Sequence, residues 1–324
     1  MTHCFSRRSF LKGSAAAAAA LTSPLLPADA AFSETENGLF SPVSALCQTQ
    51  YGPVKGREGK NGLLCWYGIP YGAAPTGESR WTAPQEPACW HTVRDCTSPA
   101  PAAYQYTTFP LGTEDCLTLD VYSSSDAKKR PVLVYLHGSA ATGSSLELPG
   151  CELVRDAGCV FVALNYRLGL FGWNCLPALT ADPDATGNFA LLDIARALDW
   201  VRDNIASFGG DPQNITVLGF AAGGRDGMAL LASPLFVGRF QKAISISGGL
   251  SLADPDAAAQ KLAENFAPLA VEDGRFADTA SAAEWLLTPG ADVREWLCGL
   301  EPARIAALGK PAILYADDVV LSRG

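Results

Sequence analysis

Histidine is scarce in this sequence, and the cysteine spacing typical of metal sites is missing. Three histidines occur in 324 residues, and only His91 and His137 lie beyond the first thirty positions. No C-x-x-C pair occurs. Structural zinc sites need four cysteine or histidine ligands, usually in closely spaced pairs. The sequence therefore gives a metal site little support, and we expect no metal.

Positive charge is also in short supply. Lys and Arg together number 24 against 33 Asp and Glu, which gives a net charge of -9 and a pI of about 4.9. No basic run longer than three residues follows Lys12. Because nucleic-acid-binding proteins need a basic patch or stripe, this composition argues against a nucleic-acid partner.

The first thirty residues have the pattern of an export signal rather than of a folded segment. Residues 6–12 (SRRSFLK) resemble the twin-arginine export signal, and an alanine-rich stretch leads to a small-residue cleavage site at 28–30. Pro24 and Pro27 interrupt that short stretch, which argues against a retained transmembrane anchor. We predict that 1–30 is a signal peptide and that the mature protein is periplasmic, cell-surface or extracellular.

Cysteine number and compartment together predict disulfides. Ten cysteines minus Cys4 of the signal leave nine, so at least one stays unpaired in an oxidising space. Cys96 with Cys116 is the first candidate pair and Cys47 with Cys65 the second. Spacing alone does not settle either pairing.

The hydrophobic pattern predicts a single α/β domain over residues 31–324. Short apolar runs bounded by turn residues are typical of strands buried on both faces. These runs are 132–136, 160–164, 215–218 and 243–246. An amphipathic helix is predicted over 191–208, an antiparallel meander over 43–67, and an alanine-rich helical region from Asp254 onward. Strands alternating with helices imply an open, mostly parallel sheet with right-handed crossovers.

Residues 215–224 (ITVLGFAAGG) read as a buried strand, a glycine-rich turn and the start of a helix. Serine esterases present their nucleophile at such a corner, in the motif G-x-S-x-G. Here the matching run extends from Gly219 to Gly223, and Ala221 stands at its centre. A methyl group can neither donate a proton nor form an acyl intermediate.

Several ordered segments resemble the type-B carboxylesterase and cholinesterase family of α/β hydrolases. They are GIPYG (68–72), EDCLTLDVY (114–122), VYLHG (134–138), NYRLGLFGW (165–173), the long run 187–219 and FQKAISISG (240–248). The resemblance covers roughly 43–248. It implies an α/β-hydrolase fold with helices flanking a mostly parallel sheet. It also implies ester hydrolysis through an acyl-serine, without metal or organic cofactor.

The resemblance assigns structural roles to four charged residues. Arg80 is expected to pair with Glu114, and Arg167 with Asp193, as buried or half-buried ion pairs. A buried charge without its partner costs several kcal/mol, so these pairs are expected to be scaffolding.

The resemblance also places an oxyanion loop at His137. Gly138 begins that loop, and Ser139 and Ala140 stand where the family has its next two glycines. Ala222, directly after the elbow, matches the family's third backbone donor and is expected to be intact. Side chains at the two glycine positions put a competent oxyanion hole in doubt.

The catalytic groups themselves are missing from the pattern. The family places its acid and its histidine after the nucleophile, and no histidine follows Ala221 here. Arg225 and Asp226 fall on the first turn of the next helix, where the family is largely uncharged. A mutually paired couple is the favoured interpretation, and a remodelled polar cleft is the alternative.

The resemblance further implies that the last strands of the sheet are missing, which leaves the strand with Ile244 and Ile246 as an uncovered edge. We therefore expect no esterase activity from this chain alone. The alternatives are a non-catalytic binding or adhesion protein, the N-terminal part of a split or frameshifted esterase completed by another chain, and a decaying gene product. The expected partner is an ester-like small molecule or a protein.

Overall fold

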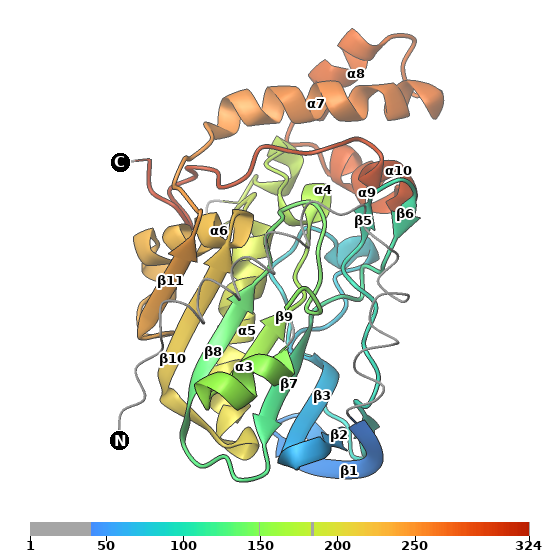
Figure 1. The fold of residues 1–324 in the computed structure, drawn as a ribbon. Helices are drawn as coiled ribbons and strands as arrows, with labels where there is room; N and C mark the ends of the chain where they lie inside the picture. Colours follow the sequence, from blue (N-terminus) through green and yellow to red (C-terminus); the bar gives the residue numbers. More distant parts are fainter. Residues whose placement is uncertain (1–39, 149, 183–184, 324) are drawn as a thin grey trace.

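The computed structural model describes residues 40–148, 150–182 and 185–323. The predicted export signal at 1–30 lies outside the described residues. Figure 1 shows a twisted sheet through the body of the molecule, with helices on both faces and further helices across one end. Among the described residues, no helix combines the length and apolar character needed to cross a bilayer.

The main sheet follows the order β1-β2-β3-β7-β9-β8-β10-β11, and β4 pairs with β2. Its strands are β1 (Phe40–Thr49), β2 (Gly52–Gly59), β3 (Leu63–Pro70), β4 (Arg94–Asp95), β7 (Thr118–Ser124), β8 (Arg130–Leu136), β9 (Val160–Leu164), β10 (Gly210–Phe220) and β11 (Lys242–Ile246). β9, β8, β10 and β11 run parallel, and β1, β2, β3 and β7 pair in antiparallel fashion. The four predicted parallel strands and the predicted meander are thus confirmed. A separate hairpin joins β5 (Gln105–Tyr106) to β6 (Pro110–Leu111).

Helices follow the strands as the pattern predicts. The α-helices are α3 (Gly150–Ala157), α4 (Gly169–Gly172), α5 (Phe189–Asn204), α6 (Ala222–Ala232), α7 (Pro255–Glu272), α8 (Thr279–Leu286), α9 (Ala291–Gly299) and α10 (Pro302–Ala306). Short 3₁₀ turns are η1 (Lys60–Gly62), η2 (Gly77–Ser79), η3 (Pro177–Leu179), η4 (Ile205–Phe208) and η5 (Pro234–Phe236). The predicted helix over 191–208 is α5 continued by η4, and left-handed Gly209 ends it. α7 and α8 lie beyond the carboxyl ends of the parallel strands (Figure 1).

Strand β9 shows why its sequence is apolar at every position. Val160, Val162 and Leu164 belong to the large core that includes α5, whereas Phe161 and Ala163 belong to a smaller cluster shared with α3. Alternate side chains of a strand point to opposite faces, so both faces here are buried.

Strand β11 is the outermost strand of the sheet among the described residues, and it pairs only with β10. The side chain of Ile244 on this strand is 42% exposed. The expected uncovered edge is therefore present in the described part of the chain.

A bidentate ion pair links two loops near α9. Nε of Arg80 lies 2.6 Å from Oε1 of Glu114, and Nη2 lies 2.8 Å from Oε2. Nη1 of the same guanidinium donates to the carbonyls of Leu297, Cys298 and Leu300. Arg80 thus joins the strand-rich part of the chain to the late helices.

A second bidentate pair is fully buried. Arg167 donates from Nε and Nη2 to the carboxylate of Asp193 at 2.8 and 2.6 Å, and its backbone N–H donates to the same carboxylate at 3.1 Å. Both side chains are at most 2% exposed. The pair fixes the loop after β9 against α5, as the sequence resemblance implied.

The substitution Arg167→Met should destabilise the protein by about 3–5 kcal/mol, because it leaves the Asp193 carboxylate buried without a counter-charge. Arg155→Met is the matched control, since Arg155 pairs with Asp156 in solvent with both side chains 58% exposed. That control should change stability by less than about 0.5 kcal/mol. Urea unfolding measures both, and equal losses would refute the scaffolding role of Arg167.

Candidate functional site

The strand-to-helix corner predicted from the sequence lies between β10 and α6. Ala221 occupies it with φ 48° and ψ −106°, a conformation that residues with a Cβ rarely adopt. Its N–H donates to the carbonyl of Ile246 at 2.9 Å, and its own carbonyl accepts from the N–H of Arg225 at 2.9 Å. These bonds hold a backbone that would otherwise relax, since such strain persists only where the surroundings impose it.

The two glycines of the motif are required by close packing of the backbone. A Cβ on Gly219 would lie 2.0 Å from the carbonyl oxygen of Gly223, and a Cβ on Gly223 would lie 2.2 Å from that of Leu136. Any side chain at either position would force the strand, the corner and the helix apart. The register that places Ala221 at the nucleophile position therefore agrees with the backbone.

The predicted oxyanion loop starts with Gly138, and both backbone polar groups of this residue are occupied. Its N–H lies 3.1 Å from each carboxylate oxygen of Glu147, and its carbonyl accepts from the N–H of Ala222 at 3.2 Å. The expectation that Ala222 offers an intact donor is therefore wrong for this conformation. Glu147, which the sequence analysis did not single out, also accepts from the hydroxyl of Tyr135 at 3.0 Å.

Ser139 and Ala140 follow with a different geometry from that of glycine. Neither residue has a positive φ, so both side chains fit without strain. Oγ of Ser139 accepts from the N–H groups of Ala141 and Thr142, at 3.3 and 3.1 Å. The backbone N–H groups of Ser139 and Ala140 make no hydrogen bond with the described part of the chain.

A buried polar group lies below the corner and joins three elements. The hydroxyl of Tyr166 donates to Oδ2 of Asp226 at 3.4 Å, and the Tyr166 ring stacks on that of His137 with centroids 4.4 Å apart. Both nitrogens of His137 and Oδ1 of Asp226 are buried without a hydrogen-bond partner. Burial raises the pKa of Asp226 to about 7 and lowers the pKa of His137 to about 4.

This arrangement answers the question of the two charges after the elbow. Asp226 is fully buried against Tyr166, whereas the side chain of Arg225 faces a cleft, and the two form no ion pair. The favoured interpretation of a mutually paired couple is thus wrong. Side chains of adjacent helix residues point in different directions, which explains why Arg225 and Asp226 do not meet.

The cleft measures about 490 Å³ and lies directly over the corner. Its walls are the oxyanion loop (138–141), Ala222 and Arg225 of α6, and the two outer segments 251–253 and 310–313. The outer segments pair with each other, since Ala253 exchanges backbone hydrogen bonds of 2.9 and 3.0 Å with the 314–316 strip. A volume of this size is in the range of small-molecule sites.

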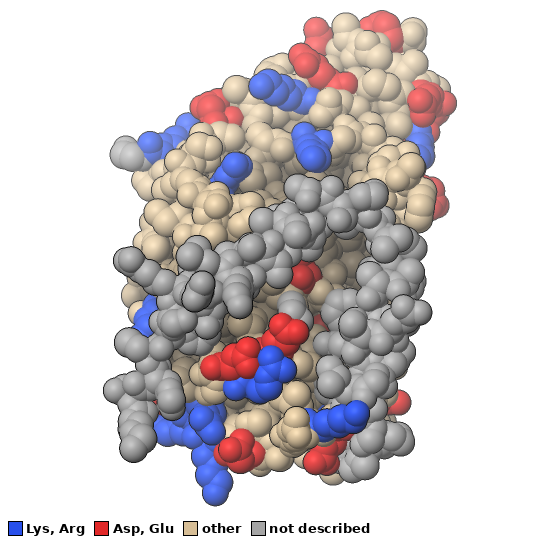
Figure 2. Space-filling view, viewed as in Figure 1, with Lys and Arg blue, Asp and Glu red and all other residues tan. Residues whose placement is uncertain are grey.

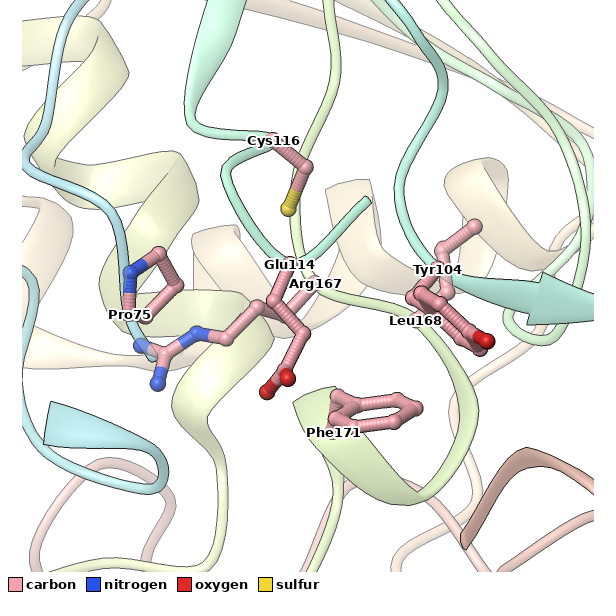
Figure 3. Close-up of a pocket in the computed structure, with 7 residues that line it drawn as sticks. All are labelled: Pro75, Tyr104, Glu114, Cys116, Arg167, Leu168 and Phe171. Atoms are coloured by element: carbon pink, nitrogen blue, oxygen red, sulfur yellow. The ribbon is translucent and has the colours of Figure 1, made fainter. Parts of the chain in front are cut away.

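A second space, bounded by Arg167 and Glu114, is much smaller. Figure 3 shows it with the Glu114 carboxylate and the Phe171 ring among its lining side chains. Its volume is about 10 Å³, which leaves room for one water at most. It is a packing void beside the two ion pairs and is too small for a ligand.

Cysteine placement overturns the disulfide predictions. No disulfide joins any two cysteines of the described residues, and the thiols of Cys96 and Cys116 are both buried. The thiols lie in different charged surroundings, Cys96 beside Arg94 and Cys116 beside Asp193 and Arg167. Burial raises the pKa of the Cys96 thiol to about 12, which disfavours the nucleophilic thiolate form.

The second predicted pair, Cys47 with Cys65, is also wrong. Cys47 donates its thiol to the carbonyl of Ser207, whereas Sγ of Cys65 lies 3.7 Å from Sγ of Cys151. The prediction paired these two cysteines by their spacing in the sequence, but the fold places their thiols beside different neighbours. Sequence distance carried no information about which face of the sheet each thiol occupies.

Neither remaining histidine can serve the corner as a base. His91 is exposed in the loop before β4 and is not part of the cleft, and His137 points into the buried group with Tyr166. Within the described ranges, no three potential metal ligands cluster. On the face shown in Figure 2, acidic and basic side chains of the described residues are interspersed rather than gathered by sign.

Comparison with known proteins places these features in a family. The profile of the Carboxylesterase family matches residues 43–286, and the profile of the TAT (twin-arginine translocation) pathway signal sequence matches residues 4–24. The para-nitrobenzyl esterase of Bacillus subtilis (strain 168) is 41% identical over 239 residues, covering 70% of this chain and 48% of that protein. The fumonisin B1 esterase of Sphingopyxis macrogoltabida is 37% identical over 216 residues, covering 63% and 39%.

Solved structures agree with the sequence relatives. A thermophilic pNB esterase superposes with a TM-score of 0.69 at 34% identity, covering 87% of this chain and 59% of that one. A carboxylesterase of Geobacillus stearothermophilus, solved at pH 6.2, gives a TM-score of 0.71 at 32% identity, covering 86% and 57%. The chain spans about half the length, or less, of the curated relatives described here.

The substitution Asp226→Asn should change how stability depends on pH. The unfolded carboxyl ionises near pH 4 and the folded one near pH 7. The unfolded state therefore loses its proton first, and wild-type stability falls between these values by up to about 1.4 kcal/mol per pH unit. The free energy of unfolding of the variant minus that of wild type should rise from pH 4 to pH 7 and then level off.

Taking the difference at each pH removes the opposing contribution of His137, whose lowered pKa makes stability rise from about pH 4 to 6.5. Asp182→Asn is the control, because Asp182 is exposed. Denaturant unfolding at half-unit pH steps gives the curves. A difference that stays flat from pH 4 to 7 would mean that Asp226 is ionised at its buried position.

Proposed function

The chain belongs to the carboxylesterase family and carries a twin-arginine export signal, and from this premise we propose that it is an exported family member that binds small molecules in its cleft without hydrolysing esters. The observation that carries the proposal is Ala221 at the strained corner. The backbone that presents a nucleophile is present, but its side chain is a methyl group. This argument holds whatever groups another polypeptide supplies, because acyl-serine chemistry starts at that one atom.

The surroundings of Ala221 support the same proposal. Loss of a serine nucleophile alone lowers kcat by about 10⁶ in a serine protease. An oxyanion hole still stabilises charge after that loss, but here Ala222 donates to Gly138 and a carboxylate lies against the Gly138 N–H. Neither of these two N–H groups is then free to stabilise the charge that develops on an ester carbonyl oxygen.

A substitute nucleophile in the cleft has no activating partner. Ser139 and Ser251 are the hydroxyl residues among the lining side chains. Ser139 contacts only backbone N–H groups and the Thr142 hydroxyl, and Ser251 has no side-chain hydrogen bond with the described residues. A serine hydroxyl without an adjacent base remains a weak nucleophile.

Purified protein should hydrolyse p-nitrophenyl butyrate no faster than buffer with an equal mass of an unrelated folded protein. It should also resist labelling by a fluorophosphonate reagent, because the two described serines of the cleft have no adjacent base. The measurements are p-nitrophenol release and intact mass. Turnover that the fluorophosphonate abolishes would disprove the proposal.

Two variants locate any activity that does occur. Ser139→Ala removes the hydroxyl that belongs to the oxyanion loop itself, so a hydrolysis rate that survives this change does not come from Ser139. Ala221→Ser restores the hydroxyl at the corner and should remain slow, because His137 and His91 do not reach it. A rapid Ala221→Ser protein would show that a base is within reach of the corner.

A further inference from the structure

The cleft over the corner has a one-sided charge. Arg225 and Lys310 are the titratable residues among those that line it, and both are cations. The described residues that line the cleft include no aspartate or glutamate. The protein as a whole has a net charge of -9, whereas the charged residues that line this cleft are both positive.

Neither cation has a direct counter-ion among the described residues. Across the described residues, the guanidinium of Arg225 and the ammonium of Lys310 form no hydrogen bond and no ion pair within 4 Å. The nearest acid in sequence, Asp226, is directed into the core toward Tyr166. Glu147 is occupied by Gly138 and Tyr135. A half-buried guanidinium with five unused donors favours an anionic partner.

Backbone donors reinforce the cations at the same wall. The N–H groups of Ser139 and Ala140 have no acceptor among the described residues, and both residues line the cleft. The helix α6 starts at Ala222, so its positive end also faces this space. The three features act on one region, whereas a helix terminus alone would attract an anion only weakly.

The rest of the cleft is apolar. The 251–253 and 310–313 segments contribute mostly aliphatic lining, namely Leu252, Ala253, Pro311, Ala312 and Ile313. An inorganic anion would leave this apolar surface exposed to water. A hydrocarbon chain would bury it, and burial stabilises the complex by about 25 cal/mol per Å² of apolar surface. The combination of a cationic wall and an apolar wall fits an amphipathic anion.

We propose that the cleft binds small organic carboxylates, with the carboxylate held by Arg225, Lys310 and the Ser139–Ala140 backbone and the hydrocarbon chain packed against the outer segments. This inference rests on the proposed function, because it names the ligand class of the same cleft. A guanidinium pairs with a carboxylate through two parallel hydrogen bonds. The bound molecule resembles the acid product of an ester rather than the ester itself.

Calorimetric titration of the full chain with sodium hexanoate tests the proposal. Hexan-1-ol, which has the same carbon chain without charge, and inorganic phosphate, which has charge without the chain, are the comparison ligands. Hexanoate should bind at least about tenfold more tightly than hexan-1-ol, the ratio expected from one charge-assisted contact. Equal affinity for hexanoate and hexan-1-ol, no hexanoate binding, or tighter binding of phosphate would each overturn the proposal.

Variants assign the binding to the cleft. Arg225→Gln should weaken hexanoate binding about tenfold or more, and Lys310→Gln should weaken it severalfold. Arg155→Gln, which removes an exposed charge on α3, should leave it unchanged. Lys310 is exposed, so its variant stays informative even if Arg225→Gln unfolds. Unchanged affinity in both cleft variants would overturn the proposal.

The two proposals fail separately. Hexanoate contains no ester, so its binding is unaffected by any hydrolytic activity. A chain that hydrolyses p-nitrophenyl butyrate and also binds hexanoate through Arg225 would contradict the proposed function only. A chain that does neither would contradict the carboxylate assignment only.

Discussion

The left-handed backbone at Ala221 is the constraint on which the site depends. Ala221 is held between the Ile246 carbonyl on β11 and the Arg225 N–H on α6, and the bare backbones of Gly219 and Gly223 make room for the turn. Because Ala221 alone separates the end of β10 from the start of α6, the helix begins directly at the end of the strand. The direction of α6 then sends Arg225 toward the cleft and Asp226 toward the core. The strain at the corner of about 1–3 kcal/mol is thus retained although the reactive group is not.

The sequence was informative where one physical rule acts alone. Val160 to Leu164 could be predicted as a strand because both faces of a central strand demand apolar side chains, and Gly209 as a helix end because its left-handed φ suits glycine. The corner could be placed because the space around Gly219 and Gly223 admits no Cβ. Where the local backbone or packing permits only a few residue types, a single sequence is enough to predict the structure.

The details that failed depend on contacts between distant segments. Nothing around Glu147 indicates that its carboxylate will meet the Gly138 N–H, and nothing near Asp226 indicates a tyrosine sixty positions earlier. The same holds for the thiols, since Cys65 of β3 lies beside Cys151 of α3 rather than beside Cys47. The prediction that Arg225 pairs with Asp226 rested on the need of a buried charge for a partner, but the helix directs the two side chains apart.

The outer wall of the cleft is built differently from its floor. The floor belongs to the central sheet and α6, but the wall consists of two strand-like segments held by the Ala253–Tyr315 bridge, outside the main sheet. The 314–316 strip is anchored in the core, because the Asn188 side chain hydrogen-bonds to the backbone N–H and C=O of Tyr315 and the Leu314 side chain is buried. The facing 251–253 segment carries the exposed Leu252 and is joined to the strip through the two main-chain hydrogen bonds of Ala253, so a local opening of the wall would start on this side.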